Sequence, residues 1–253
     1  MKKILSLSVL GLKQVRRQKL FVAMVFFFIL YLGFCLFLGK LSVAHADKVL
    51  RDTGLMGIEI SLVILSIFGL SLDFARERST HTLDIYLLHL GRSAYLATKM
   101  LSYILASCLY LVISGLALSI FLLLYRSFTP AIFGALYSLL LKITLVIAFT
   151  SLFAVVFSSP LLAMSATLFI YIGAELLPSA WEIMSRTPNV YERGVIYTIY
   201  AIFPNFSRLD FRYLAVWGNF PSGTQIVQVT IYTLAYLVCV YLLNTIVLGK
   251  KEL

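Results

Sequence analysis

Six long stretches of the chain lack the regular polar positions that a soluble helix needs. A helix that crosses about 30 Å of hydrocarbon requires roughly 20 apolar residues. Stretches of this kind, each with at most one charged residue, predict six transmembrane helices at about 20–39, 53–72, 100–125, 131–157, 160–178 and 224–248. Ser158-Ser159-Pro160 divides an apolar run that is too long for one crossing, because proline ends a helix or begins the next. We therefore expect an all-α, polytopic membrane protein.

Composition supports lipid as the solvent for most of the 253 residues. Hydrophobic residues make up 61% of the chain and charged residues 13%, with a mean hydropathy of +0.96. Soluble domains average about 45–50% apolar and about 25% charged residues. These values exclude a soluble enzyme, a disordered chain and a disulfide-stapled secreted module. We expect one transmembrane domain over residues 1–253.

The first 19 residues predict a helix on the membrane surface. At 100° per residue, one arc holds most of the apolar positions, and most basic side chains lie on the other arc. The apolar positions are Ile4, Leu5, Val9, Leu12 and Val15. Positive charge after so short an apolar core argues against a cleaved signal peptide.

The net charge of +10 fits the positive-inside rule and requires no nucleic-acid partner. Six spans place both termini on one side, which we assign to the cytoplasm of a prokaryote, with the chain in its inner membrane. The segments then inside carry twelve of the 21 basic residues: Lys2, Lys3, Lys13, Arg16, Arg17, Lys19, Arg76, Arg78, Arg92, Lys99, Lys250 and Lys251.

Two connections are longer than turns. Segment 73–92 is polar at its start and then places Leu83, Tyr86, Leu87 and Leu90 at helical spacing, which predicts a short amphipathic cytoplasmic helix that lies on lipid or in a groove of a partner. Segment 176–223 is rich in proline and aromatic residues. It predicts short helices that dip into the outer leaflet, anchored by Trp181, Tyr191, Tyr197, Tyr200, Tyr213 and Trp217. That outer segment is either an ordered cap or a surface for an extracytoplasmic partner.

Charged groups within the spans are the main candidates for an intramembrane role. They are Glu59, Lys142 and Glu175, and each serves either as a structural anchor or in a substrate pathway. Lys142 lies near mid-bilayer if its helix begins at Pro130, and reaches the surface if the helix begins near Tyr137. Glu59 is expected close to an outer end, in a wet site. No catalytic, cofactor-binding or metal-binding residue is predicted, since the sequence has no nucleophile–base pattern, no Walker A motif and no metal-site spacing.

The order of these elements resembles the membrane subunit of a type-2 ABC transporter. In that family the link between spans two and three carries an acidic–basic pair, a Gly-Thr, a Leu-rich stretch and an Arg before the next span. Here the link reads Arg76-Glu77-Arg78, His81-Thr82, 83–88 and Arg92, followed by Thr98-Lys99. His81 and Thr98 depart from the family pattern. Segments 157–163 and 203–210 are further similar to permeases annotated with multi-copper enzyme maturation or gliding motility.

The resemblance implies a permease powered by a separate ATPase, which would hold the ATP and Mg²⁺. Two ATPase subunits would assemble with this chain and a second copy or a paralogue of it. The cytoplasmic link would be the coupling helix seated in an ATPase groove. The residues that would form this interface are Arg76, Glu77, Arg78, Thr82, Leu83, Asp84, Tyr86 and Leu87.

Two other classes stay open. A membrane-embedded enzyme acting on lipid requires polar groups that converge within the bilayer, which the sequence alone does not establish. A non-catalytic scaffold would use the outer aromatic segment to hold an extracytoplasmic partner. The sequence names neither the cargo nor the direction of transport.

Overall fold

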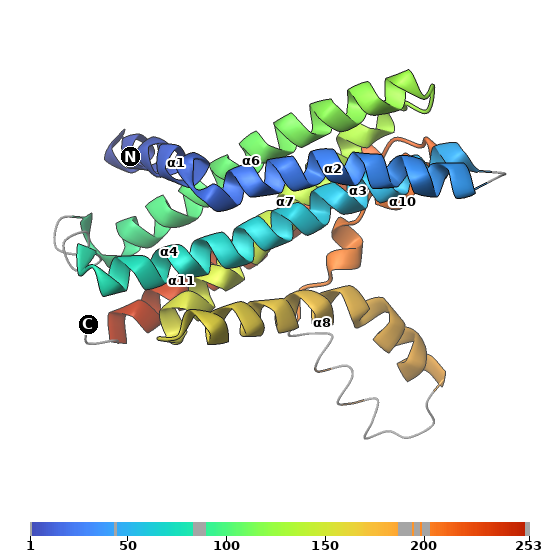
Figure 1. The fold of residues 1–253 in the computed structure, drawn as a ribbon. Coiled ribbons are helices and arrows are strands. Elements are labelled where there is room, and N and C mark those ends of the chain that lie inside the picture. The colour runs from blue at the N-terminus through green and yellow to red at the C-terminus, as the bar shows by residue number, and fades with distance from the viewer. Residues whose placement is uncertain are drawn as a thin grey trace.

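In the computed structural model, residues 2–42, 45–82, 90–186, 194, 198 and 203–250 are described. Helices account for most of them, and the two ends of the chain lie at the same end of the bundle (Figure 1). We call this end, where α4 finishes and α6 begins, the termini end. The helices are α1 (Lys2–Arg17), α2 (Lys19–Leu41), α3 (Ala46–Ile64), α4 (Leu70–Ser79), α6 (Arg92–Leu124), α7 (Ala131–Val156), α8 (Pro160–Arg186), α10 (Arg212–Trp217) and α11 (Gly223–Lys250).

Within these ranges, six helices are long and apolar enough to cross a membrane. They are Lys19–Leu41, Ala46–Ser79, Arg92–Leu124, Ala131–Val156, Pro160–Leu177 and Gly223–Lys250. Each contains or closely matches one predicted span, so the all-α prediction with six spans is confirmed and the chain is a polytopic membrane protein. The break at 157–159 is also as predicted, with α8 beginning at Pro160.

Two spans differ from prediction at the termini end. The second is a continuous helix from Ala46 to Ser79, so that residues 73–79 form its last turns instead of a surface link. The third begins at Arg92, not at residue 100. The reason is physical: Asp73 and Glu77 both pair with Lys99 inside the protein, so these charged residues do not end the helices at the membrane boundary.

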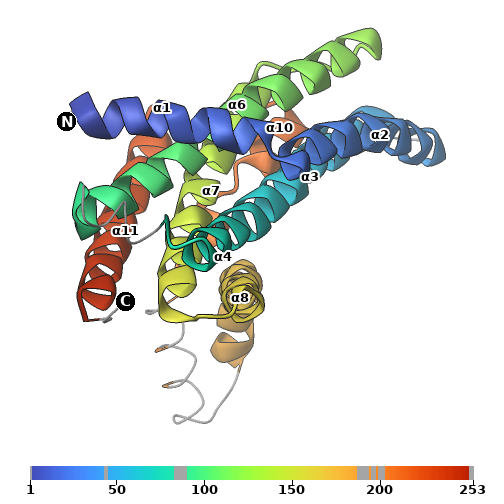
Figure 2. The ribbon, with the colours of Figure 1, turned by 60° about the vertical axis from the view of Figure 1, so that its left-hand side comes forward.

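The centre of the bundle is formed by α7 and the long helix Ala46–Ser79. Helix α7 packs against α11, α8, α6, α4 and α10, and α2 packs along α3 (Figures 1 and 2). Only 17% of the apolar window of α2 or α11 is buried, against 72% for Ala46–Ser79. Helices α2 and α11 therefore present most of their apolar surface outward, as lipid-facing helices do.

A π-helical turn, η1 (Leu65–Gly69), interrupts the long second span midway between α3 and α4. It is buried against α2, α6, α7 and α8. Such turns widen the helix locally and are frequent at functional sites.

The segment before the last span contains short helices, as predicted. A 3₁₀-helix, η2 (Phe206–Leu209), and α10 pack against α7, and Phe206, Leu209 and Ala215 are buried there. Tyr213 and Trp217 are exposed. Tyr191, Tyr197 and Tyr200 lie outside the described residues, and the side chain of Trp181 is not among those described.

Close approach of α2 and α3 depends on Gly57. A Cβ atom at this position would lie 2.3 Å from ring atoms of Tyr31, whereas nothing lies within 4 Å of a Cβ at Gly33 on α2. We expect Gly57→Ala to lower the free energy of unfolding by about 1–3 kcal/mol through overpacking. Gly33→Ala, the matched control, should raise it by up to about 1 kcal/mol through helix propensity. Unfolding in mixed micelles measures both, and equal effects would contradict the close packing.

Candidate functional site

A buried polar cluster joins α4 to α6 at the termini end. Lys99 Nζ lies 2.5 Å from Glu77 Oε1 and 3.3 Å from Asp73 Oδ2. Tyr95 donates to Glu77 at 2.5 Å, and Tyr103 donates to Asp73 at 2.8 Å. We call these five residues the termini-end cluster. All five are buried, so the cluster locks the two helices where the link between them begins.

Helical spacing explains how the sequence builds this cluster. Asp73 and Glu77 are four residues apart and therefore share one face of α4. Tyr95, Lys99 and Tyr103 follow the same spacing on α6. Gln18, at the backbone break between α1 and α2, donates to Asp73 at 2.7 Å. The cluster thereby also holds the junction of the N-terminal helix with the first span.

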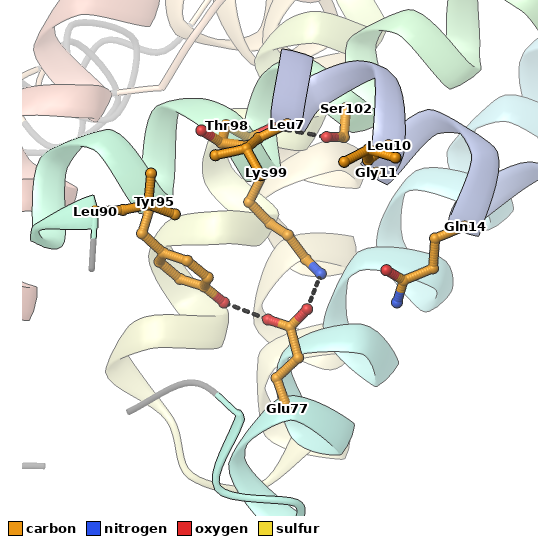
Figure 3. Close-up of a pocket in the computed structure, with 10 residues that line it drawn as sticks. All are labelled: Leu7, Leu10, Gly11, Gln14, Glu77, Leu90, Tyr95, Thr98, Lys99 and Ser102. Carbon is orange, nitrogen blue, oxygen red and sulfur yellow. Dashed lines mark hydrogen bonds and ion pairs between the residues drawn. The ribbon is translucent and has the colours of Figure 1, made fainter. Parts of the chain in front are cut away.

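A cavity of about 130 Å³ opens beside this cluster. Its lining combines polar groups and leucines, namely Leu7, Leu10, Gly11, Gln14, Glu77, Leu90, Tyr95, Thr98, Lys99 and Ser102. In Figure 3, Tyr95 and Lys99 extend from α6 toward Glu77, and Gln14 approaches from α1. Movement of α1 or of the link between α4 and α6 would therefore displace groups that surround the Lys99–Glu77 ion pair.

Arg78 ties the end of α4 to the end of α7. Its guanidinium donates to the carbonyl oxygens of Ala154 at 2.6 Å, Val155 at 3.2 Å and Phe157 at 2.8 Å. The last carbonyls of a helix have no partner within the helix, so Arg78 acts as a cap for α7. Its neighbour Arg76 is exposed.

We expect Arg78→Ala to lower the free energy of unfolding by about 2 kcal/mol, because hydrogen bonds to a charged group each contribute about 1.5–3 kcal/mol and water can replace part of them. Arg76→Ala, the matched control on the same helix, should change it by less than about 0.5 kcal/mol. Denaturant titration in micelles gives both values. The capping role is wrong if the two variants lose the same stability.

A second cluster, which we call the central cluster, lies deeper in the bundle. Lys142 on α7 pairs with Glu59 of α3 and with Glu175 of α8. Tyr171 donates to Glu59 at 2.9 Å, and Arg212 Nη1 lies 3.4 Å from the other oxygen of Glu59. The two cations balance the two glutamates, which offsets the high cost of charge in an apolar interior.

Helix lengths place this cluster near the middle of the membrane. Because α7 begins at Ala131, Lys142 is roughly 17 Å along it at 1.5 Å per residue. Glu59 is likewise roughly 20 Å from Ala46, and only 5% of its surface is exposed. The expected wet site near an outer end is therefore wrong for Glu59: α3 starts seven residues earlier than the predicted span, and the carboxylate points inward.

Arg212 connects the central cluster to the short helix α10. Burial alone would lower the pKa of Arg212, but the charges of Asp210 and Glu59 outweigh burial and raise that pKa above its ordinary value. Arg212 also lies 3.2 Å from Asp210 and 3.5 Å from Asp52. Arg212 therefore stays positively charged and holds α10 against the central cluster, where α3, α7 and α8 meet.

The structure brings together Glu59, Lys142 and Glu175, which the sequence suggested only one by one. Of the predicted coupling residues, Arg76 is exposed, Thr82 is half-buried, and Glu77 and Arg78 point inward. Leu83, Asp84, Tyr86 and Leu87 lie outside the described residues. The sequence reasoning missed Asp73, Tyr95 and Tyr103, although their spacing of four residues is a signal that could have found them.

A scan against models of protein families gives no match, and a search of curated proteins gives none either.

Proposed function

We propose that this chain is the permease subunit of a transporter driven by a separate ATPase, as its resemblance to type-2 ABC permeases implies. The observation that carries the proposal is the termini-end cluster. Its buried Glu77–Lys99 ion pair anchors the two helices, α4 and α6, that the link connects. A push on the link at the cytoplasmic face would move α4, α6 and the α1–α2 junction together, because the same cluster holds all three.

The long second span supports transmission of that push. The helix from Ala46 to Ser79 carries Glu77 near one end and Glu59 past its middle, with the π-helical turn between them. Glu59 and Glu77 lie about 27 Å apart along the helix axis at 1.5 Å per residue. One continuous helix thus joins the cytoplasmic link to the central cluster, which is the arrangement that coupling by helix tilt requires.

The proposal is tested by purifying the tagged chain from its native membranes and identifying the proteins that accompany it. We expect a protein with a Walker A motif, and we expect Leu83→Asp with Leu87→Asp to abolish its recovery. Leu124→Asp, at the opposite end of α6 and 77% exposed, is the control that should retain it. Purification of an intact chain with no ATP-binding protein would contradict the proposal.

Convergence of Glu59, Lys142 and Glu175 favours a second candidate, a membrane-embedded enzyme acting on lipid. Carboxylates beside a lysine are the kind of groups such chemistry uses. The test is incubation of the reconstituted chain with phospholipid alone. Lipid products that disappear with Glu175→Gln would support the enzyme, and unchanged lipid would exclude it.

A further inference from the structure

We infer that a groove beside the α1–α2 junction binds the phosphate headgroup of an anionic phospholipid. The groove is open, with a volume of about 670 Å³, and is lined by Leu10, Gln14, Gln18 and four cations, Lys13, Arg17, Lys19 and Arg76. Ligand pockets generally measure about 300–1,000 Å³. The inference goes beyond the proposed function and does not depend on it.

The four cations have no anionic partner in the part of the chain that is described. Lys99, Lys142 and Arg212 each pair with carboxylates, whereas Lys13, Arg17, Lys19 and Arg76 are exposed and form no ion pair within those ranges. The nearby carboxylate of Asp73 is already engaged by Lys99. Four like charges around one groove repel each other, and a phosphate would relieve that repulsion through charge-assisted hydrogen bonds.

The lipid-facing surface of α2 continues directly from this groove. At 100° per residue, Phe26, Leu30 and Phe37 lie within roughly 20° of Lys19 around the helix. These three side chains are 62%, 61% and 59% exposed. A phospholipid with its headgroup at Lys19 would therefore lay an acyl chain along this stripe. An acidic protein surface would match the charges but not the apolar stripe below them.

Helix α1 forms the side of the groove that faces the start of α2, and it would contact the lipid headgroup. Helix α1 packs across α6 and ends at the start of α2, which runs at an angle to it (Figure 2), and its Leu10 is 58% exposed at the edge of the groove. Basic and apolar side chains side by side at the end of a span are the pattern by which proteins select anionic lipids. Leu10 and Gln14 also line the cavity beside Glu77, so a bound lipid would contact two side chains that adjoin the termini-end cluster.

The experiment is native mass spectrometry of the purified protein equilibrated with equal amounts of phosphatidylglycerol and phosphatidylcholine. Each engaged cation contributes roughly a fivefold preference. We expect the wild type to retain phosphatidylglycerol at least tenfold over phosphatidylcholine, and K13Q/R17Q/K19Q to lose that preference. The matched control K40Q/R126Q/R208Q removes three exposed cations elsewhere and should keep it.

Each other outcome has a definite meaning. Equal retention of the two lipids by the wild type, or an unchanged preference in K13Q/R17Q/K19Q, overturns the inference. Displacement of the lipid by millimolar inorganic phosphate assigns the groove to a free anion and likewise overturns it. If K13Q/R17Q/K19Q loses an accompanying ATPase but keeps the lipid preference, the groove is a protein contact, and the lipid site is excluded.

Discussion

Replacing Lys142 by methionine should lower the free energy of unfolding by about 3–5 kcal/mol, because the buried Glu59 and the half-buried Glu175 would lose their shared cation. Methionine has nearly the length of lysine, so the loss reports charge and not volume. Reversible unfolding in mixed micelles measures the effect. Lys40→Met, at an exposed position of α2, is the control and should change stability by less than about 0.5 kcal/mol.

Neutralising the two carboxylates together with Lys142 gives the decisive comparison. Glu59→Gln and Glu175→Gln in the Lys142→Met background remove the two negative charges that Lys142 compensated, so most of the lost stability should return. If the triple variant is as unstable as Lys142→Met, the penalty comes from packing and the ion-pair account of the central cluster is wrong.

If the proposed permease function is correct, replacing Glu77 by glutamine should uncouple the permease from its ATPase while leaving the complex assembled. The amide oxygen can still accept the hydrogen bond from Lys99, and the amide NH2 can donate to the hydroxyl of Tyr95. Lys99 also keeps its ion pair with Asp73, so the fold survives. The charged tie between the link and α6 is lost. Coupling energies of about 1–3 kcal/mol correspond to changes of about 5- to 150-fold. We expect stimulation of ATP hydrolysis by the assembled permease to fall by at least about tenfold.

The measurement is the rate of ATP hydrolysis by the co-purified complex in nanodiscs, divided by the rate of the ATPase alone. Asp47→Asn makes the same carboxylate-to-amide change in α3, far from the link, and should leave the ratio unchanged. A normal ratio for Glu77→Gln would show that the termini-end cluster does not transmit the ATPase motion.

The spans could be predicted from sequence because each depends on local composition. A run of about 20 apolar residues and one Ser-Ser-Pro break are sufficient to place six helices to within a few residues at most ends. The two exceptions at the termini end have one cause. Asp73, Glu77 and Lys99 resembled the polar border of a membrane, whereas they lie inside the protein and pair with each other.

The clusters themselves depend on which helices become neighbours. Lys142 pairs with a carboxylate 83 residues earlier in the chain, and Arg212 reaches Glu59 from 153 residues away. Spacing along one helix predicts that Tyr95, Lys99 and Tyr103 share a face, yet it does not say which helix lies opposite. The opposite helix is α4, and a single sequence gives no local signal for that pairing.

The proposed coupling to an ATPase is tested most directly by crosslinking from the link in native membranes. Cys35, Cys108 and Cys239 would first be replaced by alanine, and Thr82→Cys then supplies one reactive thiol at the start of the link. With a short bifunctional reagent, we predict a crosslink to a protein that carries a Walker A motif, with a yield that changes when ATP is added. Leu124→Cys, at the other end of α6, should give none. A Thr82→Cys chain that is inserted and labelled, yet crosslinks to no ATP-binding protein with or without ATP, would contradict the account.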